Sequence, residues 1–166
     1  MYGYRREEPA HYQTAQVCQN GHVITSAIES SPERQQKFCG KCGAETITKC
    51  PNCSAPIHGY HVSPGIVSFH TPDLDSYCYQ CSAPYPWTLA RLEAGRALID
   101  LSHEAPVEKQ SLKDDLNAVT TDTPRAKVAA LRLKRFISKA ASDIGPPLQQ
   151  IVVDVATAAI KKDLGV

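Results

Sequence analysis

Seven cysteines and one histidine are the residues of this chain whose types and spacing could do chemistry. They form four pairs in the first half of the sequence, with two residues between the members of three pairs and three residues in the fourth. A two-residue spacing lets one tight turn direct both thiolates at a metal ion about 2.3 Å away. Eight ligands make two tetrahedral sites, so we predict two structural Zn²⁺ ions, held by Cys18, His22, Cys39, Cys42, Cys50, Cys53, Cys78 and Cys81.

The four pairs can be connected in two ways. Consecutive pairing gives one site in residues 18–42 and another in residues 50–81, whereas a cross-braced arrangement of the RING type would join the first pair to the third. The seven residues between Cys42 and Cys50 favour consecutive pairing over cross-bracing, which stays open as the alternative. His58, His61 and His70 have no cysteine at ligand spacing, and we expect them to be exposed loop histidines.

Neither metal is expected to be catalytic, because a catalytic zinc keeps one position open for water and usually has three protein ligands. The zinc-deaminase signature is incomplete, since the chain contains no His-x-Glu. Cys39 and Cys42 have the spacing of a redox dithiol but lack the βαβ context of a thioredoxin-like protein. The sequence therefore predicts that the protein is not an enzyme.

Length and charge place few other limits on the function. The 166 residues carry a net charge of +1, and they contain neither a long apolar run that could span a membrane nor an apolar signal segment at the start. Without export the cysteines would stay reduced, which favours metal–thiolate bonds over disulfides. We therefore expect a cytoplasmic protein.

Composition changes near Trp87, and with it the expected architecture. Residues 1–16 are predicted to be a flexible leader that could add a strand. Residues 17–86 are predicted to form tandem zinc ribbons with short strands near 16–17, 45–48 and 65–69, and residues 87–166 a helical domain. The expected fold is thus a small metal-bound β domain followed by an all-α domain, α+β overall.

Helix signals divide the second half into four segments. The first is expected from Thr88, as N-cap, to about His103, and the second over residues 107–119. The third begins where Thr123 can cap and Pro124 suits the first helical position. The last follows Gly145-Pro146-Pro147 and is expected to continue to Lys162.

The third of these helices carries a basic stripe. No acidic residue occurs between Pro124 and Ser142, and four basic residues fall within one quadrant of a helical projection, roughly opposite the apolar side. Such a stripe can bind phosphates on nucleic acid, an acidic protein surface or anionic lipid headgroups. The alternative is a solvated face paired with neighbouring acids such as Asp114, Asp115 and Asp122. The candidate residues are Arg125, Arg132, Arg135 and Lys139.

The last helix is unusually apolar. Leu148, Ile151, Val152, Val155 and Ala159 form one face, while lysine, glutamine and aspartate keep a polar side. We expect this helix to be the centre of the helical domain, and the alternative is that part of it forms a homodimer or partner surface.

Four sequence runs together resemble a known family. They are Ala15 to Ile24 around the first pair, Phe38 to Ala44 around the second, Cys50-Pro51-Asn52-Cys53, and Tyr77 to Cys81 followed by Pro84 to Thr88. In these motifs the chain resembles the bacterial zinc-ribbon family catalogued as domain of unknown function 2321, over nearly its whole length. One departure is Ser82, where such ribbons usually have glycine. The resemblance implies the fold and the metal sites but no activity.

The favoured function is nucleic-acid binding through the ribbons and the basic helix. The alternative is a protein–protein adaptor subunit of a bacterial complex, with an acidic protein surface as partner, and a metal-dependent enzyme comes third. These hypotheses differ in the expected role of Arg125, Arg132, Arg135 and Lys139, which contact phosphates only under the first.

Overall fold

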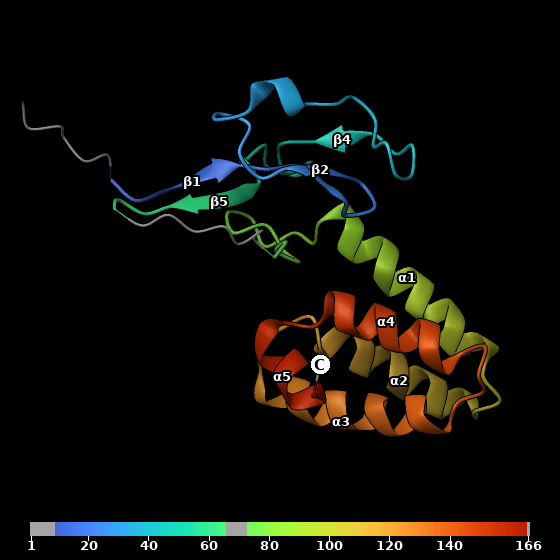
Figure 1. Ribbon diagram of the computed structural model, residues 1–166. Helices are drawn as coiled ribbons and strands as arrows, with labels where there is room; N and C mark the ends of the chain where they lie inside the picture. The colour runs from blue at the N-terminus through green and yellow to red at the C-terminus, as the bar shows by residue number, and fades with distance from the viewer. Residues whose placement is uncertain (1–8, 66–72, 166) are drawn as a thin grey trace, which may run out of the picture. The chain divides into compact units, whose positions relative to one another are not determined.

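The computed structural model describes residues 9–65 and 73–165 and divides the chain into two compact units, residues 1–87 and 88–166 (Figure 1). The first unit contains small β-sheets and all the cysteines, and the second is helical. The chain is therefore α+β, as expected. Each unit is described by itself.

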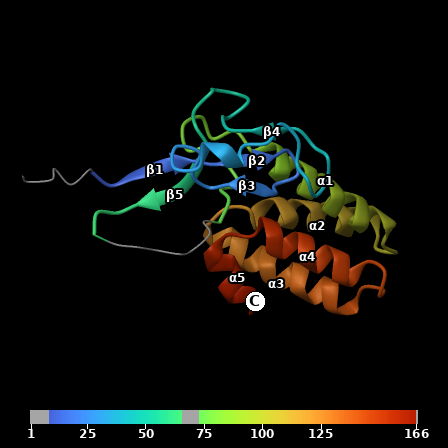
Figure 2. The same ribbon diagram turned by 45° about the horizontal axis from the view of Figure 1, so that its top comes forward.

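The described residues of the first unit form two small antiparallel sheets (Figure 2). Strand β1 (His11–Thr14) pairs with β5 (His58–Val62), and β2 (Gln16–Cys18) lies between β3 (Val23–Thr25) and β4 (Thr46–Ile47). A 3₁₀ turn at Pro32–Arg34 lies in the connection from β3 to β4. Because strands this short bury little surface, their alignment depends on the turns that connect them.

The core of the first unit mixes a few apolar side chains with cysteines of the candidate metal sites. Ala15, Val17 and Ile57 are buried there together with the aromatic rings of Tyr85 and Trp87. The cysteines Cys50 and Cys78 belong to the same cluster. A core this small stabilises a domain weakly, so ligand bonds to a metal would have to supply much of its folding free energy.

One predicted strand stays untested, and one strand was not predicted. The predicted strand at residues 65–69 lies almost wholly outside the described residues, and β5 forms at His58–Val62. Strand β5 was not predicted because its residues are mostly polar and show no strand pattern. Its extended backbone is explained by its pairing with β1. Gly59 is required in β5, since a Cβ there would lie 2.0 Å from the backbone oxygen of Ser26. Within the predicted leader, residues 11–14 form β1, and residues 1–8 lie outside the described part.

Five helices follow the cysteine-rich unit (Figure 2). They are α1 (Pro86–Leu101), α2 (Pro106–Ala118), α3 (Pro124–Lys139), α4 (Gly145–Val155) and α5 (Ala158–Leu164). Proline in the first turn fits a helix start because the N–H it lacks has no partner there. The side chain of Thr123 accepts a hydrogen bond from the Ala126 N–H, which confirms the predicted cap. Thr88 is not a cap, since α1 already begins two residues before it.

The last predicted helix is in fact two helices. Ala156 and Thr157 have extended backbone, with ψ values of 144° and 160°, and they separate α4 from α5. The Thr157 side chain accepts a hydrogen bond from the Ile160 N–H and so starts the new helix. The break turns Ile160 into the core, where it is fully buried. Sequence periodicity missed the break because neither Ala nor Thr is a strong helix breaker.

Helix α3 contacts three other helices, namely α2, α4 and α5 (Figure 2). Its buried residues include the small Ala126, Ala129 and Ala130, which allow helices to approach closely. Leu148, Val152 and Val155 of α4 are buried in the same core. The apolar side of α4 therefore packs within this unit, as expected, and no helix in the described part of the chain is long and apolar enough to cross a membrane.

Candidate metal centres

The three Cys-x-x-Cys segments share one backbone conformation, which we call the knuckle. In each, the N–H of the first cysteine donates to the carbonyl of an alanine five residues later, and the N–H four residues later donates back to the cysteine carbonyl. The first bond measures 2.8 to 2.9 Å in all three knuckles, and so does the second. The first-bond pairs are Cys39 with Ala44, Cys50 with Ala55, and Cys78 with Ala83.

The residue after the second cysteine has left-handed backbone in every knuckle. Gly43, Ser54 and Ser82 have φ values of 73°, 62° and 56°. Glycine adopts this conformation without cost, whereas serine carries a Cβ that makes it unfavourable. Ser82, the departure from the usual ribbon pattern, therefore keeps the turn but under backbone strain.

The Cys–His pair uses a different turn, at the end of the β2–β3 hairpin. The Gly21 N–H donates to the Cys18 carbonyl at 2.8 Å, and Gly21 has φ 84°. The Cys18 N–H donates to the His22 carbonyl at 3.0 Å. The additional residue between the two ligands is thus part of a hairpin turn that contains a required glycine.

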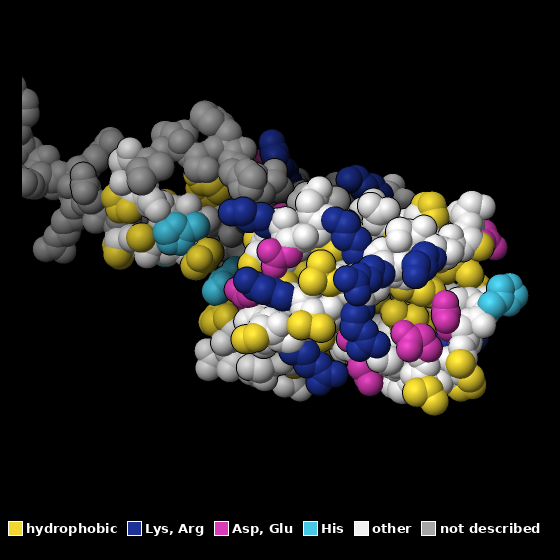
Figure 3. Space-filling view, turned by 90° about the horizontal axis from the view of Figure 1, so that it is seen from below, with side chains coloured by type: hydrophobic (Ala, Val, Ile, Leu, Met, Phe, Trp, Pro, Cys, Tyr) yellow, Lys and Arg dark blue, Asp and Glu magenta, His cyan; other side chains and the backbone are white. Residues whose placement is uncertain are grey.

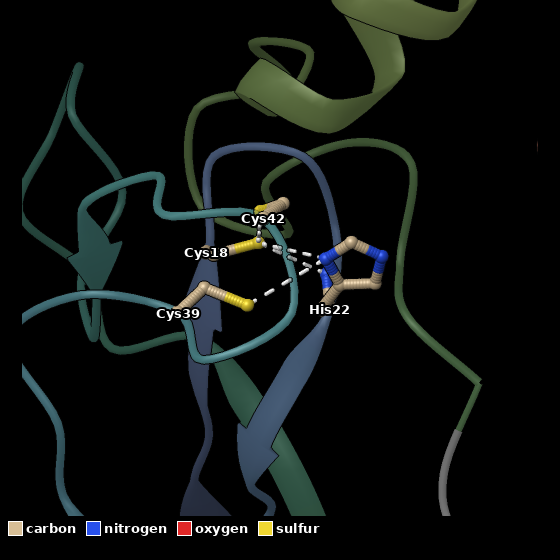
Figure 4. Close-up of side chains that lie close together, drawn as sticks. All are labelled: Cys18, His22, Cys39 and Cys42. Atoms are coloured by element: carbon tan, nitrogen blue, oxygen red, sulfur yellow. Dashed lines mark hydrogen bonds between the residues drawn. The ribbon is translucent and has the colours of Figure 1, made fainter.

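The eight candidate ligands meet in two groups of four, and the ligand atoms within each group lie within 4.8 Å of one another. One group is Cys18, His22, Cys39 and Cys42 (Figure 4), and the other is Cys50, Cys53, Cys78 and Cys81. The pairs are therefore connected consecutively, and the cross-braced alternative is wrong.

The distances inside each group fit a tetrahedral ion. Four sulfurs placed 2.3 Å from one zinc ion would be about 3.8 Å apart. In the second group the sulfur of Cys50 lies 3.8 Å from that of Cys81, and Cys53 lies 3.6 Å from Cys78. The donor set and its size thus suit a metal ion bound mainly by thiolates.

His22 faces the first group through Nδ1. This nitrogen lies 3.5 Å from the Cys18 sulfur and 3.6 Å from the Cys39 sulfur, and the other ring nitrogen points away (Figure 4). A nitrogen at about 2.05 Å and a sulfur at about 2.3 Å from one ion would be about 3.6 Å apart. The position of the imidazole nitrogen is therefore that of a fourth ligand.

The other histidines lie elsewhere. His58 and His61 belong to β5, and His70 lies outside the described residues. The expectation of an exposed loop histidine is wrong for His58, because its ring is stacked between Tyr12 and Tyr79, with centroids 4.2 and 3.9 Å away. His61 is exposed, as expected, but it lies in a strand and not in a loop. The Nδ1 atom of His58 also lies 3.7 Å from a carboxylate oxygen of Asp75.

An asparagine reaches across between ligand pairs in each group. Asn20, between Cys18 and His22, donates through Nδ2 to the Cys42 sulfur at 3.4 Å. Asn52, between Cys50 and Cys53, hydrogen bonds to Cys81 and lowers the pKa of that thiol. In sequence these asparagines look like ordinary turn residues, and only the paired geometry shows that they stabilise thiolates.

Hydrogen bonding lowers the pKa of some thiols in these groups, and crowding raises the pKa of another. The backbone N–H of Ala44, followed by Asn20, lowers the pKa of Cys42 to about 6. Burial raises the pKa of Cys78, but N–H groups of Cys81 and Gln80 outweigh it and bring the value to about 6. The Ala55 N–H favours the Cys53 thiolate, yet burial and three nearby sulfurs raise the pKa of Cys53 to about 12. A group so crowded can hold all its thiolates only if a cation neutralises them.

Tyr85 and Trp87 form one wall of the second group. Their rings stack with centroids 4.4 Å apart, and both side chains are buried. The indole Nε1 of Trp87 donates to the Asp75 carbonyl at 3.0 Å. Burial, with the nearby Cys78 thiolate, raises the pKa of Tyr85. These aromatic rings therefore pack against the ligand loops and are not available to stack on nucleobases.

The predicted basic stripe on α3 is only partly solvated. Five of the six basic side chains of α3 are exposed, and Arg132 is the exception. Arg132 lies 3.3 Å from the buried carboxylate of Asp115 and 3.7 Å from Glu108, both in α2, and it donates to Ser111. Burial raises the pKa of Asp115, against the effect of the Arg132 charge. Arg132 therefore fastens α3 to α2.

The remaining members of the stripe stay open. No ion pair joins Arg125, Arg135 or Lys139 to an acidic side chain in the part of the chain that the structure describes. Lys127 is likewise exposed without such a pair, and Lys134 donates to the Leu164 carbonyl at 2.8 Å. Figure 3 shows a band of Lys and Arg side chains across one face of the helical unit, with acidic side chains beside it.

A comparison with known protein families finds a match over most of the chain. A family described as "uncharacterized protein conserved in bacteria" (DUF2321) matches residues 11–164. The match covers both the cysteine-rich unit and the helices. No curated protein and no solved structure matches the chain.

Proposed function

The chain belongs to the bacterial family DUF2321, and we propose that it is a non-catalytic module that holds two structural Zn²⁺ ions and binds nucleic acid. The proposal rests on one observation above all. Helix α3 carries six basic residues and no acidic one. Five of its basic side chains are exposed without an ion pair among the described residues, and one of these, Lys134, donates to the Leu164 carbonyl. Phosphate groups are the partners that such a surface attracts most strongly.

Zinc is the ion that the two ligand groups suit best. One group offers four thiolates and the other three thiolates and an imidazole, and both sets are typical of structural zinc. Each group supplies four protein ligands, which leaves no position for a reacting water. Zinc would therefore stabilise the loops of residues 18–81, and the proposed role is structural. Metal–thiolate ligation also needs reduced cysteines, which supports a cytoplasmic location.

The basic residues proposed to contact phosphates are exposed side chains of α3 that, among the described residues, make no contact holding the fold together. Arg125, Lys127, Arg135 and Lys139 are exposed on α3. Arg132, although part of the stripe, neutralises Asp115 and would have to leave that carboxylate unpaired in order to reach a ligand. We therefore place Arg132 outside the binding set.

A protein adaptor is the second candidate, and a specific feature favours it. Val128 and Leu131 are 59% and 53% exposed on the same helix as the open basic residues. Apolar side chains between cations suit an acidic amphipathic partner better than a phosphate backbone. A partner of that kind would bind less well when Val128 and Leu131 are replaced by serine, whereas electrostatic binding to nucleic acid would barely change.

The test is a titration of fluorescent duplex DNA and RNA at about 50 mM salt, where electrostatic binding is strong. A variant with Arg125, Lys127, Arg135 and Lys139 all changed to Gln should bind at least tenfold more weakly and show a flatter salt dependence. Each lost phosphate contact should reduce the slope of log K against log salt by about 0.9 on duplex DNA.

A charge-keeping variant is the matched control. Changing Arg125→Lys and Arg135→Lys preserves the number of positive charges and should leave the salt dependence of binding unchanged, because its slope depends on how many phosphates are neutralised. If the wild-type protein does not bind either duplex at this salt concentration, the proposal that α3 binds the phosphates of duplex nucleic acid is wrong, and the adaptor proposal takes its place for this helix.

A further inference from the structure

The aromatic side chain of Phe38 is exposed, and the packing of the described residues does not account for it. Its side chain is 54% exposed, although it directly precedes the ligand Cys39. Tyr12 and Tyr79 are similarly exposed in the same unit, but each stacks on His58. No such ring contact involves Phe38 among the described residues, and it lies outside the apolar core of this unit.

The knuckle itself does not require an aromatic residue there. Phe38, Lys49 and Tyr77 occupy the same position in the three knuckles, each bridging to the residue that follows the knuckle alanine. Lys49 fills that position with an exposed, charged side chain. The turn therefore tolerates a residue that is not aromatic at this position, although Tyr77 also supplies a ring in the third knuckle.

The backbone on both sides of Phe38 is held firmly. The Lys37 carbonyl accepts from the Thr46 N–H at 3.1 Å, and the Cys39 N–H donates to the Ala44 carbonyl at 2.8 Å. The buried side chain of Gln16 hydrogen bonds to both the N–H and the carbonyl of Gln36, at 3.0 and 2.8 Å. An exposed ring on a fixed backbone loses little conformational entropy when it binds a partner.

One cation lies beside the ring, and the nearby sequence is basic. The Lys37 ammonium lies 5.4 Å from the ring centroid of Phe38, and Lys41 is exposed at the tip of the same knuckle. Residues 34–49 carry four basic residues and one acidic residue, Glu45, which forms a backbone bridge with Phe38. Arg34 is paired with Glu33, 4.0 Å away. An aromatic face beside cations is the combination with which proteins hold unpaired bases, since the ring stacks on the base and the cations attract its phosphates.

We infer that Phe38, with Lys37 and Lys41, forms a stacking platform for an unpaired nucleobase, so that the cysteine-rich unit binds single-stranded nucleic acid. This inference deepens the proposed nucleic-acid function and rests on it. It names the partner more narrowly, because bases inside a duplex already stack on each other and offer no free face to the ring. The base could belong to DNA or RNA, since stacking does not distinguish them.

Phe38→Trp supplies a direct probe. The only natural tryptophan, Trp87, is 1% exposed, so a tryptophan at residue 38 would dominate any fluorescence change caused by a ligand. Addition of a 12-nucleotide oligo-dT or oligo-rU should quench the Phe38→Trp variant and leave wild-type fluorescence unchanged. A tryptophan at residue 38 that does not respond to saturating oligonucleotide would overturn the stacking platform.

Affinity provides the second readout. Phe38→Ser should weaken oligo-dT binding about tenfold and leave duplex binding unchanged, whereas Phe38→Trp should restore single-strand affinity. Leu101→Ser, at a side chain that is 69% exposed in α1, controls for the loss of an exposed apolar group and should have no effect. Two zinc ions per chain in each variant would show that the fold is kept.

The two proposals fail in different ways. If the α3 variant binds duplex as well as wild type does, the basic face of α3 is not the phosphate site, and the fluorescence of the Phe38→Trp variant still tests the platform. If Phe38→Ser binds oligo-dT as wild type does, or loses duplex affinity equally, the platform is wrong while the α3 proposal stands.

Discussion

The side-chain amide of Asn20 donates a hydrogen bond to the Cys42 sulfur, 3.4 Å away, and so connects the two ligand pairs of the first group. Asn52 makes the corresponding contact to Cys81 in the second group. Each asparagine lies within one ligand pair and stabilises a thiolate of the other. The same asparagine–thiolate contact therefore occurs from a Cys–His hairpin and from a knuckle, although the two turns have different backbones.

Replacing either asparagine should weaken one metal site. We expect Asn20→Ala or Asn52→Ala to lower zinc affinity of its own site about tenfold or more, because the thiolate loses a donor that orients it. Competition with a chromophoric chelator measures the two sites separately. Gln19→Ala, at an exposed neighbour of Asn20, is the matched control and should leave both affinities unchanged.

Single ligand substitutions should remove one ion each. Cys18→Ser is expected to leave one zinc ion per chain, bound by the second group, and Cys53→Ser to leave one bound by the first, since the two groups share no ligand. Elemental analysis of the purified variants gives the count. Loss of both ions from either variant would show that the two sites fold as one unit and contradict this independence.

Among the histidines in the described residues, His22 alone should affect metal content. His22→Ala should halve it, while His58→Ala and His61→Ala should retain two ions, because only His22 directs a ring nitrogen at a sulfur group. His22→Cys keeps four ligands and is expected to restore the second ion. A full metal content in His22→Ala would show that three thiolates suffice at the first site.

The left-handed serines are positions where glycine should stabilise the protein. Ser54→Gly and Ser82→Gly each remove a Cβ from a residue with φ near 60°, and we expect each to raise the unfolding free energy by about 1 kcal/mol. Gly43→Ala should lower it by a similar amount. Thermal unfolding of the zinc-bound protein, followed by the fluorescence of Trp87, measures the change. If both serine-to-glycine changes lowered the unfolding free energy, the serine side chains would stabilise the protein by more than their backbone strain destabilises it.

Arg132 should matter for stability and Arg135 should not. Arg132→Gln leaves the Asp115 carboxylate buried without its cation and is expected to cost about 3 kcal/mol. Arg135→Gln removes an exposed charge and should stay within about 0.5 kcal/mol. Adding Asp115→Asn to Arg132→Gln should recover part of the loss, because no buried charge then remains. Chemical denaturation of the three variants provides the comparison.

The sequence by itself determined the two groups of candidate ligands and the start of α3. A pair of cysteines two residues apart restricts the backbone so strongly that local spacing is sufficient to identify a metal turn, and a cap such as Thr123 acts within its own first turn. Both are short-range effects, so they can be read from neighbouring residues. The histidine of the first group was found for the same reason, from its four-residue step across Gly21.

Only the tertiary structure decided which segments pair and which side chains from different segments contact each other. The pairing of β1 with β5 depends on residues more than 40 positions apart, and nothing local in the polar sequence of β5 indicates it. The engagement of Arg132 by Asp115 likewise depends on how α2 meets α3, so a helical projection of α3 placed Arg132 with residues that remain open. Long-range contacts of this kind are set by the packing of whole elements, and the sequence of one element does not contain them.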